Sequence, residues 1–259
     1  MQITSKRLFL LDMDGTIYLG NRLFDYTLKF LERIEKSGAR YIFFTNNSSK
    51  GREAYLEKIH RMGIKAESSQ LITSTHASIK YLQENHADEL IYTFGTASFR
   101  HELITSGLNI TTCVEPGIKA LIMGYDPEIT AQKLEDACIL LGRDIDYIAT
   151  NPDYVCPTEY GYFPDCGSVA IMLKNATGRE PRFMGKPAPD MVMMALEQEG
   201  VRKEDTVLIG DRQYTDVACG IAAGIDTVLV LSGETARKDI PHSPHQPTWI
   251  ADHVGELRF

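Results

Sequence analysis

The sequence predicts an α/β protein: a doubly wound parallel sheet with helices on both faces, joined to a second, smaller α/β domain. Short apolar runs alternate along the chain with segments whose apolar residues recur at helical spacing. This alternation is typical of parallel sheets, because each parallel strand needs a crossover, usually a helix, to reach the next one. A chain of 259 residues is also long enough to form two domains of ordinary size.

The first third of the chain supplies three predicted strands with helices between them. The strands are residues 8–11, 39–44 and 70–73. The first helix is predicted from Phe24, Leu28, Leu31 and Ile34, with Gly38 as its stop, and the second covers residues 50–62 and is closed by Gly63.

The later part of the chain keeps this alternation. Further strands are predicted over residues 90–95, 118–124, 146–150, 205–211 and 226–233. Helices are predicted over residues 134–141 and around 218–222. Residues 151–168 are rich in Pro, Gly and Tyr and show neither period, so we expect a long loop there, which in a compact domain is usually functional.

Composition excludes several classes of function. The formal charge of −8 argues against nucleic acid or an anionic membrane surface as the main partner. No apolar run is long enough to span a membrane, and no signal segment opens the chain. Five cysteines in no metal-ligand spacing are expected to be reduced thiols of a cytoplasmic protein.

Polar residues follow the predicted strands at their carboxyl ends, where open parallel sheets bind ligands. Asp12 and Asp14 follow the first strand, "TNNS" (45–48) ends the second, Lys186 follows "RFMG", and Asp211 ends another strand with Asp216 close behind. Each cluster alone has a simpler explanation: an acidic turn, a helix cap, a solvated lysine or an acid in the first turn of a helix. Their joint occurrence at strand ends favours one shared site.

These residue types suit phosphoryl transfer. Carboxylates are hard oxygen ligands for Mg²⁺, so we expect Asp12 and Asp211 to hold that ion, which also offsets the cost of placing acids together. Lys186 offers a point charge to phosphate oxygens, and Thr45 and the Asn46 backbone can donate hydrogen bonds to them. Phosphoryl transfer also needs a nucleophile, which an aspartate supplies by forming an aspartyl-phosphate.

In order and residue type, the clusters resemble the four motifs of the haloacid dehalogenase (HAD)-type phosphatases. "DMDGT" (12–16) resembles motif I, "TNN" (45–47) motif II, Lys186 motif III and "GDRQYTD" (210–216) motif IV. The resemblance implies that Asp12 is the nucleophile. It implies that Asp14 is the acid/base and also offers its backbone carbonyl to Mg²⁺.

The same resemblance implies roles for the remaining candidates. Thr45, Asn46 and Lys186 would hold the phosphoryl group. Asp211 would complete the metal site, and Asp216 would orient Lys186 or a metal-bound water.

Motif spacing implies where the second domain is inserted. Asp12 and Thr45 are only 33 residues apart, whereas Thr45 and Lys186 are 141 residues apart. We therefore expect a HAD-like catalytic core over residues 1–75 and 181–259, and an α/β cap of the C2 type over residues 76–180. This placement, together with "GKPAPD" and "AGIDTVLVLSG", resembles the NagD-like, 4-nitrophenylphosphatase-type group over nearly the whole chain.

One residue departs from that group. Asp165 stands in the predicted cap loop where a small residue is usual, and an extra acid facing a phosphate would repel it. Asp165 is therefore a candidate for substrate recognition, and the alternative is that its side chain points to water.

The sequence thus predicts a Mg²⁺-dependent phosphatase that acts on a small phosphorylated metabolite and also hydrolyses p-nitrophenyl phosphate. A phosphomutase is disfavoured, because related mutases place the cap between motifs I and II. A binding or regulatory module with a relic site is disfavoured because Asp12, Asp14, Lys186 and Asp211 are all present, and a relic would be free to lose them. The substrate stays open among nucleotide monophosphates, sugar phosphates and similar esters, and so does the oligomeric state, for which the resemblance suggests a homodimer through the cap.

Overall fold

The computed structural model describes residues 3, 5–49, 51–158 and 161–258, and the chain divides into two compact units. Unit 1 comprises Met1–Thr45, Glu53–Ile72 and Lys186–Phe259, and unit 2 comprises Asn46–Arg52 and Thr73–Gly185. Within the described residues, no helix has the length and apolar character needed to cross a membrane. Residues 76–180 lie within unit 2, and their action as a cap stays a prediction.

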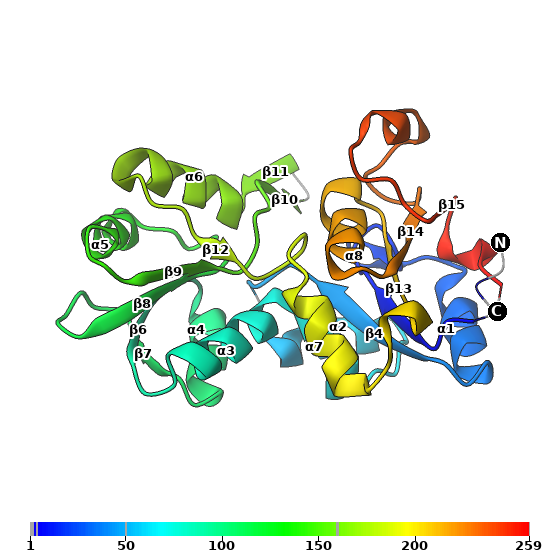
Figure 1. Ribbon diagram of the computed structural model, residues 1–259, viewed down its shortest axis with the longest axis horizontal. Helices are drawn as coiled ribbons and strands as arrows, with labels where there is room; N and C mark the ends of the chain where they lie inside the picture. Colours follow the sequence, from blue (N-terminus) through cyan, green and yellow to red (C-terminus); the bar gives the residue numbers. More distant parts are fainter. Residues whose placement is uncertain (1–2, 4, 50, 159–160, 259) are drawn as a thin grey trace. The chain divides into compact units, whose positions relative to one another are not determined.

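Unit 1 is built on a six-stranded sheet with the strand order β15-β14-β13-β1-β4-β5 (Figure 1). The strands are β1 (Leu8–Leu11), β4 (Arg40–Thr45), β5 (Leu71–Thr73), β13 (Thr206–Gly210), β14 (Asp226–Val230) and β15 (Trp249–Ala251). The pairs of β1 with β4 and β13, of β13 with β14 and of β14 with β15 are all parallel. Strand order reverses beside β1, so the carboxyl ends of β1 and β13 form the switch point at which open sheets bind ligands.

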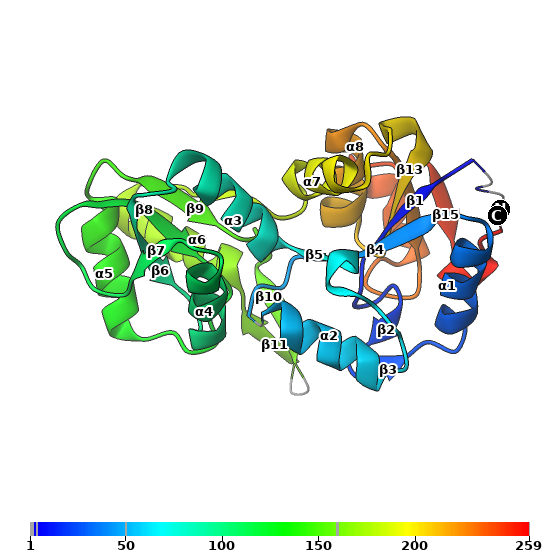
Figure 2. The same ribbon diagram turned by 90° about the horizontal axis from the view of Figure 1, so that it is seen from below.

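Helices cover both faces of this sheet. They are α1 (Thr27–Lys36), α2 (Arg52–Arg61), α7 (Asp190–Glu199) and α8 (Ala218–Ala223). Figure 2 shows α1 and α2 on one side of the strands and α7 and α8 on the other. Phe9 and Leu11 share a core with Phe30 of α1 and Ile59 of α2. All four residues of β1 are buried because the sheet is covered on both faces.

Shorter elements complete unit 1. A two-stranded hairpin, β2 (Tyr18–Leu19) and β3 (Arg22–Leu23), follows β1. Short 3-10 or π-helical segments lie at Ser68–Gln70, Lys203–Asp205, Gln213–Val217, Arg237–His242 and Val254–Glu256. The turn at Gln213–Val217 is a π-helix that leads directly into α8, a local feature often found at functional sites.

Unit 2 has its own parallel sheet, with the order β12-β9-β8-β6-β7. The strands are β6 (Leu90–Phe94), β7 (Asn109–Thr111), β8 (Ile118–Met123), β9 (Asp146–Ala149) and β12 (Arg182–Phe183). Its helices are α3 (Ser74–Asn85), α4 (Ala97–Thr105), α5 (Ala131–Leu141) and α6 (Cys166–Thr177). Figure 1 shows α5 and α6 over one face of the sheet and α3 and α4 over the other. The predicted α/β fold class is thereby confirmed for both units.

The segment predicted as a long loop, residues 151–168, contains regular structure instead. An antiparallel hairpin is formed by β10 (Val155–Thr158) and β11 (Gly161–Pro164), and α6 begins at Cys166. The two strands pair with each other, and Tyr162 is 71% exposed. Because neither face of the hairpin is fully buried, its sequence lacks the apolar alternation by which strands are predicted.

A short segment after β4, residues 46–52, belongs to unit 2 although its chain neighbours on both sides belong to unit 1. The Ser48 hydroxyl lies 2.8 Å from the Thr150 hydroxyl and accepts a hydrogen bond from the Tyr125 backbone N–H at 2.9 Å. The Asn151 side chain donates to the Asn46 carbonyl at 3.0 Å. Buried polar contacts therefore integrate this segment into unit 2.

Candidate active site

Asp12 lies directly after β1 and continues its ladder, because its backbone N–H donates to the Ile209 carbonyl at 2.8 Å. The residue is only 9% exposed. The Thr16 hydroxyl donates to Asp12 Oδ2 at 3.3 Å. A buried carboxylate at this position needs compensating charge or hydrogen bonds.

Lys186 supplies that charge. Its Nζ donates to Asp12 Oδ1 at 2.6 Å, to Asp216 Oδ1 at 2.6 Å and to the Phe44 carbonyl at 3.3 Å. The side chain is 3% exposed, so the alternative of a solvated surface lysine is wrong. Burial by itself lowers the pKa of the ammonium, but the charges of Asp12 and Asp216 outweigh burial and raise that pKa.

Asp211 lies after β13 and is 2% exposed. Its Oδ2 accepts a hydrogen bond from the Glu234 backbone N–H at 2.6 Å. Its Oδ1 is buried and has no hydrogen-bond partner in the described part of the chain. Burial raises the pKa of Asp211, and the charges of Asp12 and Asp216 raise it further.

Asp12, Asp211 and Asp216 each place one carboxylate oxygen within 4.8 Å of the others. It is the one such group of potential metal ligands among the described residues. Three carboxylates this close together repel one another, and one of them, Asp211, has a buried oxygen without a hydrogen-bond partner among the described residues. A divalent cation would compensate both the repulsion and the missing partner. These residues therefore fit a divalent metal.

Asp14 lies outside this cluster of carboxylates and its side chain reaches solvent. The Gly20 backbone N–H donates to Asp14 Oδ1 at 3.4 Å. Desolvation by the surrounding protein raises the pKa of Asp14, against the opposing charges of Lys58 and Arg212. A carboxyl group with a raised pKa holds its proton to a higher pH, which a general acid requires.

The predicted phosphate-binding pair Thr45 and Asn46 is divided between the two units. Thr45 is the last residue of β4, beside β1 in the sheet of unit 1. Asn46 is buried in unit 2, where its side-chain amide donates to Asp153 Oδ2 at 3.0 Å. Its carbonyl accepts a hydrogen bond from the Ser74 hydroxyl at 2.5 Å.

Asp165 has a structural contact that sequence reasoning missed. It is the N-cap of α6, where its Oδ1 accepts the Cys166 backbone N–H at 2.5 Å, and it is 5% exposed. The alternative in which this side chain points to water is therefore wrong. A contact between Asp165 and substrate stays a prediction.

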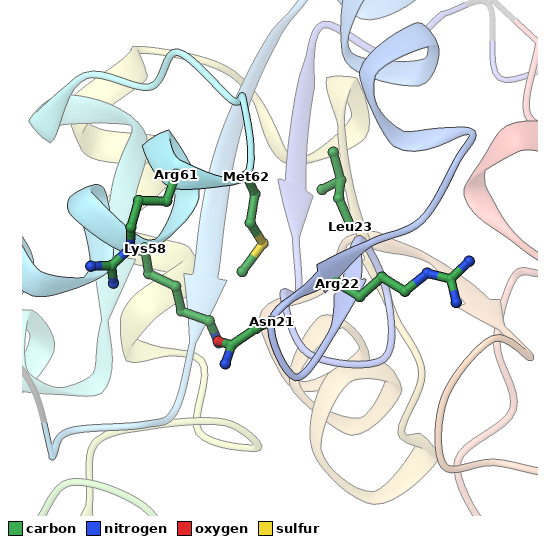
Figure 3. A pocket seen from close by; sticks show the side chains of 6 residues that line it. All are labelled: Asn21, Arg22, Leu23, Lys58, Arg61 and Met62. Atoms are coloured by element: carbon green, nitrogen blue, oxygen red, sulfur yellow. The ribbon is translucent and has the colours of Figure 1, made fainter.

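A separate pocket of about 540 Å³ lies in unit 1 beside the β2–β3 hairpin. Figure 3 shows Lys58 extending toward Asn21, with Met62 and Leu23 nearby. The side chains of Arg22 and Arg61 point away from each other on opposite sides (Figure 3). Because these cationic groups do not converge on one point, the pocket is not an assembled anion site.

The family of the chain follows from its matches to known proteins. Residues 9–109 match the model of a haloacid dehalogenase-like hydrolase, and residues 183–257 match a second model described as HAD-hydrolase-like. An acid sugar phosphatase of Staphylococcus haemolyticus is 31% identical over 241 residues, covering 93% of this chain and 91% of that protein. The chain belongs to the haloacid dehalogenase-like hydrolases.

Solved structures agree with this assignment. The 4-nitrophenylphosphatase of Thermotoga maritima is 36% identical, with a TM-score of 0.92, over 98% of this chain and 96% of that one. A glycerol phosphate phosphatase of Mycobacterium tuberculosis in complex with calcium is 26% identical, with a TM-score of 0.90, over 96% of this chain and 74% of that one. The predicted 4-nitrophenylphosphatase-type subfamily is confirmed, and so is the prediction of a phosphoric monoester hydrolase.

Sequence reasoning about this haloacid dehalogenase-like hydrolase missed a polar group beside Asp211. Arg212 Nε pairs with Glu234 Oε2 at 2.8 Å, and the Tyr214 hydroxyl donates to Glu234 Oε1 at 2.8 Å. Arg212 and Tyr214 lie inside the motif IV segment "GDRQYTD", so their position in the sequence was a signal for a role at this site. Glu234 directly follows the predicted strand 226–233, so its position at the carboxyl end of a strand is the signal by which it could have been found.

Proposed function

We propose that this phosphatase uses Mg²⁺ and an aspartyl-phosphate on Asp12 to hydrolyse a small phosphorylated metabolite. The observation that carries the proposal is the buried cluster in which Lys186 joins Asp12 and Asp216 beside Asp211. Buried charges are costly, so a cluster of three acids and one lysine at the switch point of a sheet favours a functional rather than a structural explanation.

Mg²⁺ is the proposed ion because it binds through one or two carboxylates and shares its remaining positions with water and phosphate. Asp12, the Asp14 backbone carbonyl and Asp211 would hold it. The ion when bound would neutralise charge on the phosphoryl oxygens. The orphaned Asp211 Oδ1 supports this assignment, since a bound cation would satisfy it.

In the first chemical step, a carboxylate oxygen of Asp12 attacks phosphorus and the bond to the leaving oxygen breaks. Asp14 gives its proton to that oxygen, and the product is an alcohol together with a phosphorylated Asp12. The raised pKa of Asp14 supports this role, because the residue must be protonated when the step begins.

In the second step, the ionised Asp14 takes a proton from water, and the water oxygen attacks the phosphorus. The bond between phosphorus and Asp12 breaks, which releases inorganic phosphate and restores both carboxyl groups. Lys186, Thr45 and the Asn46 backbone would hold the phosphoryl oxygens in both steps. Asp216 would keep the Lys186 ammonium oriented, which is supported by their 2.6 Å contact.

The relatives support a small substrate. One is named for sugar phosphates and another for glycerol phosphate, so we propose a phosphate ester of a sugar or a polyol ahead of a nucleotide monophosphate.

The decisive experiment measures inorganic phosphate released from p-nitrophenyl phosphate and from a panel of phosphorylated metabolites ranked by kcat/KM. We expect turnover with Mg²⁺, none with EDTA, and none for a folded Asp12→Asn variant. Turnover that is unchanged by EDTA would refute the metal, and hydrolysis by Asp12→Asn would refute the nucleophile. Transfer of the phosphoryl group to another hydroxyl without phosphate release would favour a phosphomutase.

A further inference from the structure

The turn after β14, residues 232–235, contacts the candidate metal ligand Asp211. The predicted strand 226–233 ends at Val230, and the chain then turns toward the site. The Glu234 N–H donates to Asp211 Oδ2 at 2.6 Å, and the Thr235 N–H donates to the Asp211 carbonyl at 3.2 Å. Two successive N–H groups of one turn thus contact the same residue.

Two glycines allow this close approach. A Cβ atom on Gly233 would lie 2.0 Å from Asp211 Oδ2 and 2.5 Å from Asp211 Cγ. A Cβ atom on Gly15 would lie 2.5 Å from the same Oδ2. The Asp211 carboxylate therefore packs directly against the backbone of both glycines. A side chain at either position would overlap with it.

Further bonds anchor the turn to the segments that carry the predicted catalytic groups. The Ser232 hydroxyl donates to the Gly15 carbonyl at 2.7 Å, which joins the turn to the "DMDGT" segment. The Glu234 side chain binds both Arg212 and Tyr214, which joins the turn to the "GDRQYTD" segment.

We propose that the 232–235 turn is a positioning element that fixes the Asp211 carboxylate through Oδ2 and so leaves Oδ1 available to the metal ion. The inference rests on the proposed function. It assigns a role to the "LSG" motif (231–233) after β14, which the proposed chemistry leaves without one.

The alternative is that the turn merely closes unit 1. Gly233 and Glu234 are solvent-exposed and add no apolar residue to the core. Their contacts converge on one buried carboxylate, of which one oxygen accepts a hydrogen bond and the other has no hydrogen-bond partner among the residues that the structure describes. Groups that orient metal ligands are typically worth about 10- to 100-fold in metal affinity.

Gly233→Ala is a selective probe, because Gly233 has no positive φ and alanine fits its backbone conformation. The added methyl group must displace the Asp211 carboxylate. We expect the dissociation constant for Mg²⁺, measured by calorimetry on the whole protein, to rise about 10- to 100-fold. The Mg²⁺ concentration for half-maximal hydrolysis of p-nitrophenyl phosphate should rise by the same factor.

Gly142→Ala is the matched control, since a Cβ atom there would meet its nearest neighbour at 3.4 Å. Its Mg²⁺ affinity should equal that of the wild type. Ser232→Ala should weaken Mg²⁺ binding by about 10-fold, at the lower end of the same range. Ser232→Thr keeps the hydroxyl and should restore the affinity, so this pair decides the question if Gly233→Ala does not fold.

Unchanged Mg²⁺ affinity in folded Gly233→Ala, or in Ser232→Ala, would overturn the positioning role while leaving the phosphatase proposal intact. Wild-type protein that neither binds Mg²⁺ nor releases phosphate would instead overturn the proposed function, and this inference with it.

Discussion

Replacing Lys186 by methionine tests whether the buried cluster is held together by charge. Methionine keeps most of the length and apolar surface of the side chain but removes the ammonium. The change leaves Asp12 and Asp216 without the cation that lies 2.6 Å from each. Asp211 is already crowded by both acids, so the repulsion among three buried carboxylates is then uncompensated.

The expected loss of stability is large. At 2.6 Å and an effective dielectric constant of about 20, each ion pair contributes about 6 kcal/mol of Coulomb attraction. Much of this attraction offsets the cost of burying the ammonium. Removing one partner from a buried pair costs about 3–5 kcal/mol, which for a protein of this size corresponds to a melting temperature lower by roughly 6–20 °C.

Thermal unfolding in EDTA and then in Mg²⁺ measures the effect. We expect the metal-free variant to melt well below the wild type and to regain much of the difference in Mg²⁺, because a bound cation replaces part of the lost charge. Lys6→Met is the control. Lys6 is also buried and its Nζ also donates to the Glu204 carbonyl, but its acidic partner Asp226 is 38% exposed, so water can solvate the carboxylate left behind. Removing Lys6 should therefore cost less than removing Lys186 and respond little to Mg²⁺.

A loss below about 1 kcal/mol for Lys186→Met, or an equal loss for both variants, would refute the reasoning. Either result would mean that the three acids do not share a buried negative charge that the ammonium compensates.

The other predictions concern the proposed general acid Asp14, the α6 N-cap residue Asp165 and the buried His76. Asp14→Asn should lose about 10²–10⁴-fold in turnover of alkyl phosphates. With p-nitrophenyl phosphate it should release a burst of nitrophenol near one equivalent and then stall with phosphate on Asp12. Rapid mixing and mass spectrometry measure this, and steady turnover without phosphorylated protein would contradict it. Asp165→Gly should lower the free energy of unfolding by only a few tenths of a kcal/mol, because glycine is a tolerated N-cap. A changed ranking of substrates by kcat/KM would therefore report on the carboxylate itself. Proportional changes for all substrates would exclude substrate recognition by Asp165. Burial lowers the pKa of His76 below its usual 6.5 despite its contact with Glu102. As the pH falls, the unfolded chain therefore binds a proton at this histidine before the folded protein does. Its contribution to stability is full above pH 6.5 and is lost as the pH falls toward the lower pKa of the folded state, by up to about 1.4 kcal/mol per pH unit; urea unfolding of His76→Gln from pH 7 to 5 should show a shallower decline, and an identical slope would count against it.

The fold was predictable wherever a local pattern records burial. Leu8–Leu11 is apolar at every position because both faces of β1 are covered. The β10–β11 hairpin was not predictable, because its strands pair with each other and leave residues such as Tyr162 exposed. The end of β14 was missed because Leu231 continues the apolar run, although the described pairing with β15 stops at Val230 and Ala251.

The candidate site was predictable as a set of residue types but not as a set of contacts. Motif order identified Lys186, whereas its burial depends on partners near residues 12, 44 and 216 that only the fold brings together. The N-cap position of Asp165 fits the helix that begins at Cys166, but the Pro, Gly and Tyr content of residues 151–168 favours a loop over the start of that helix. No local pattern could predict that Glu234 donates to Asp211, because the contact joins the ends of two neighbouring strands.

The place of residues 46–52 in unit 2 decides how the protein can be dissected. A fragment cut as residues 73–185 looks complete in the sequence, but it would leave the Tyr125 N–H without its Ser48 acceptor and remove the Ser48 partner of Thr150. Each buried polar group stranded in this way costs about 1–3 kcal/mol. A stand-alone form of unit 2 would therefore need the heptapeptide grafted onto one of its ends, and a fragment of residues 73–185 alone should be less stable by about that amount for each group.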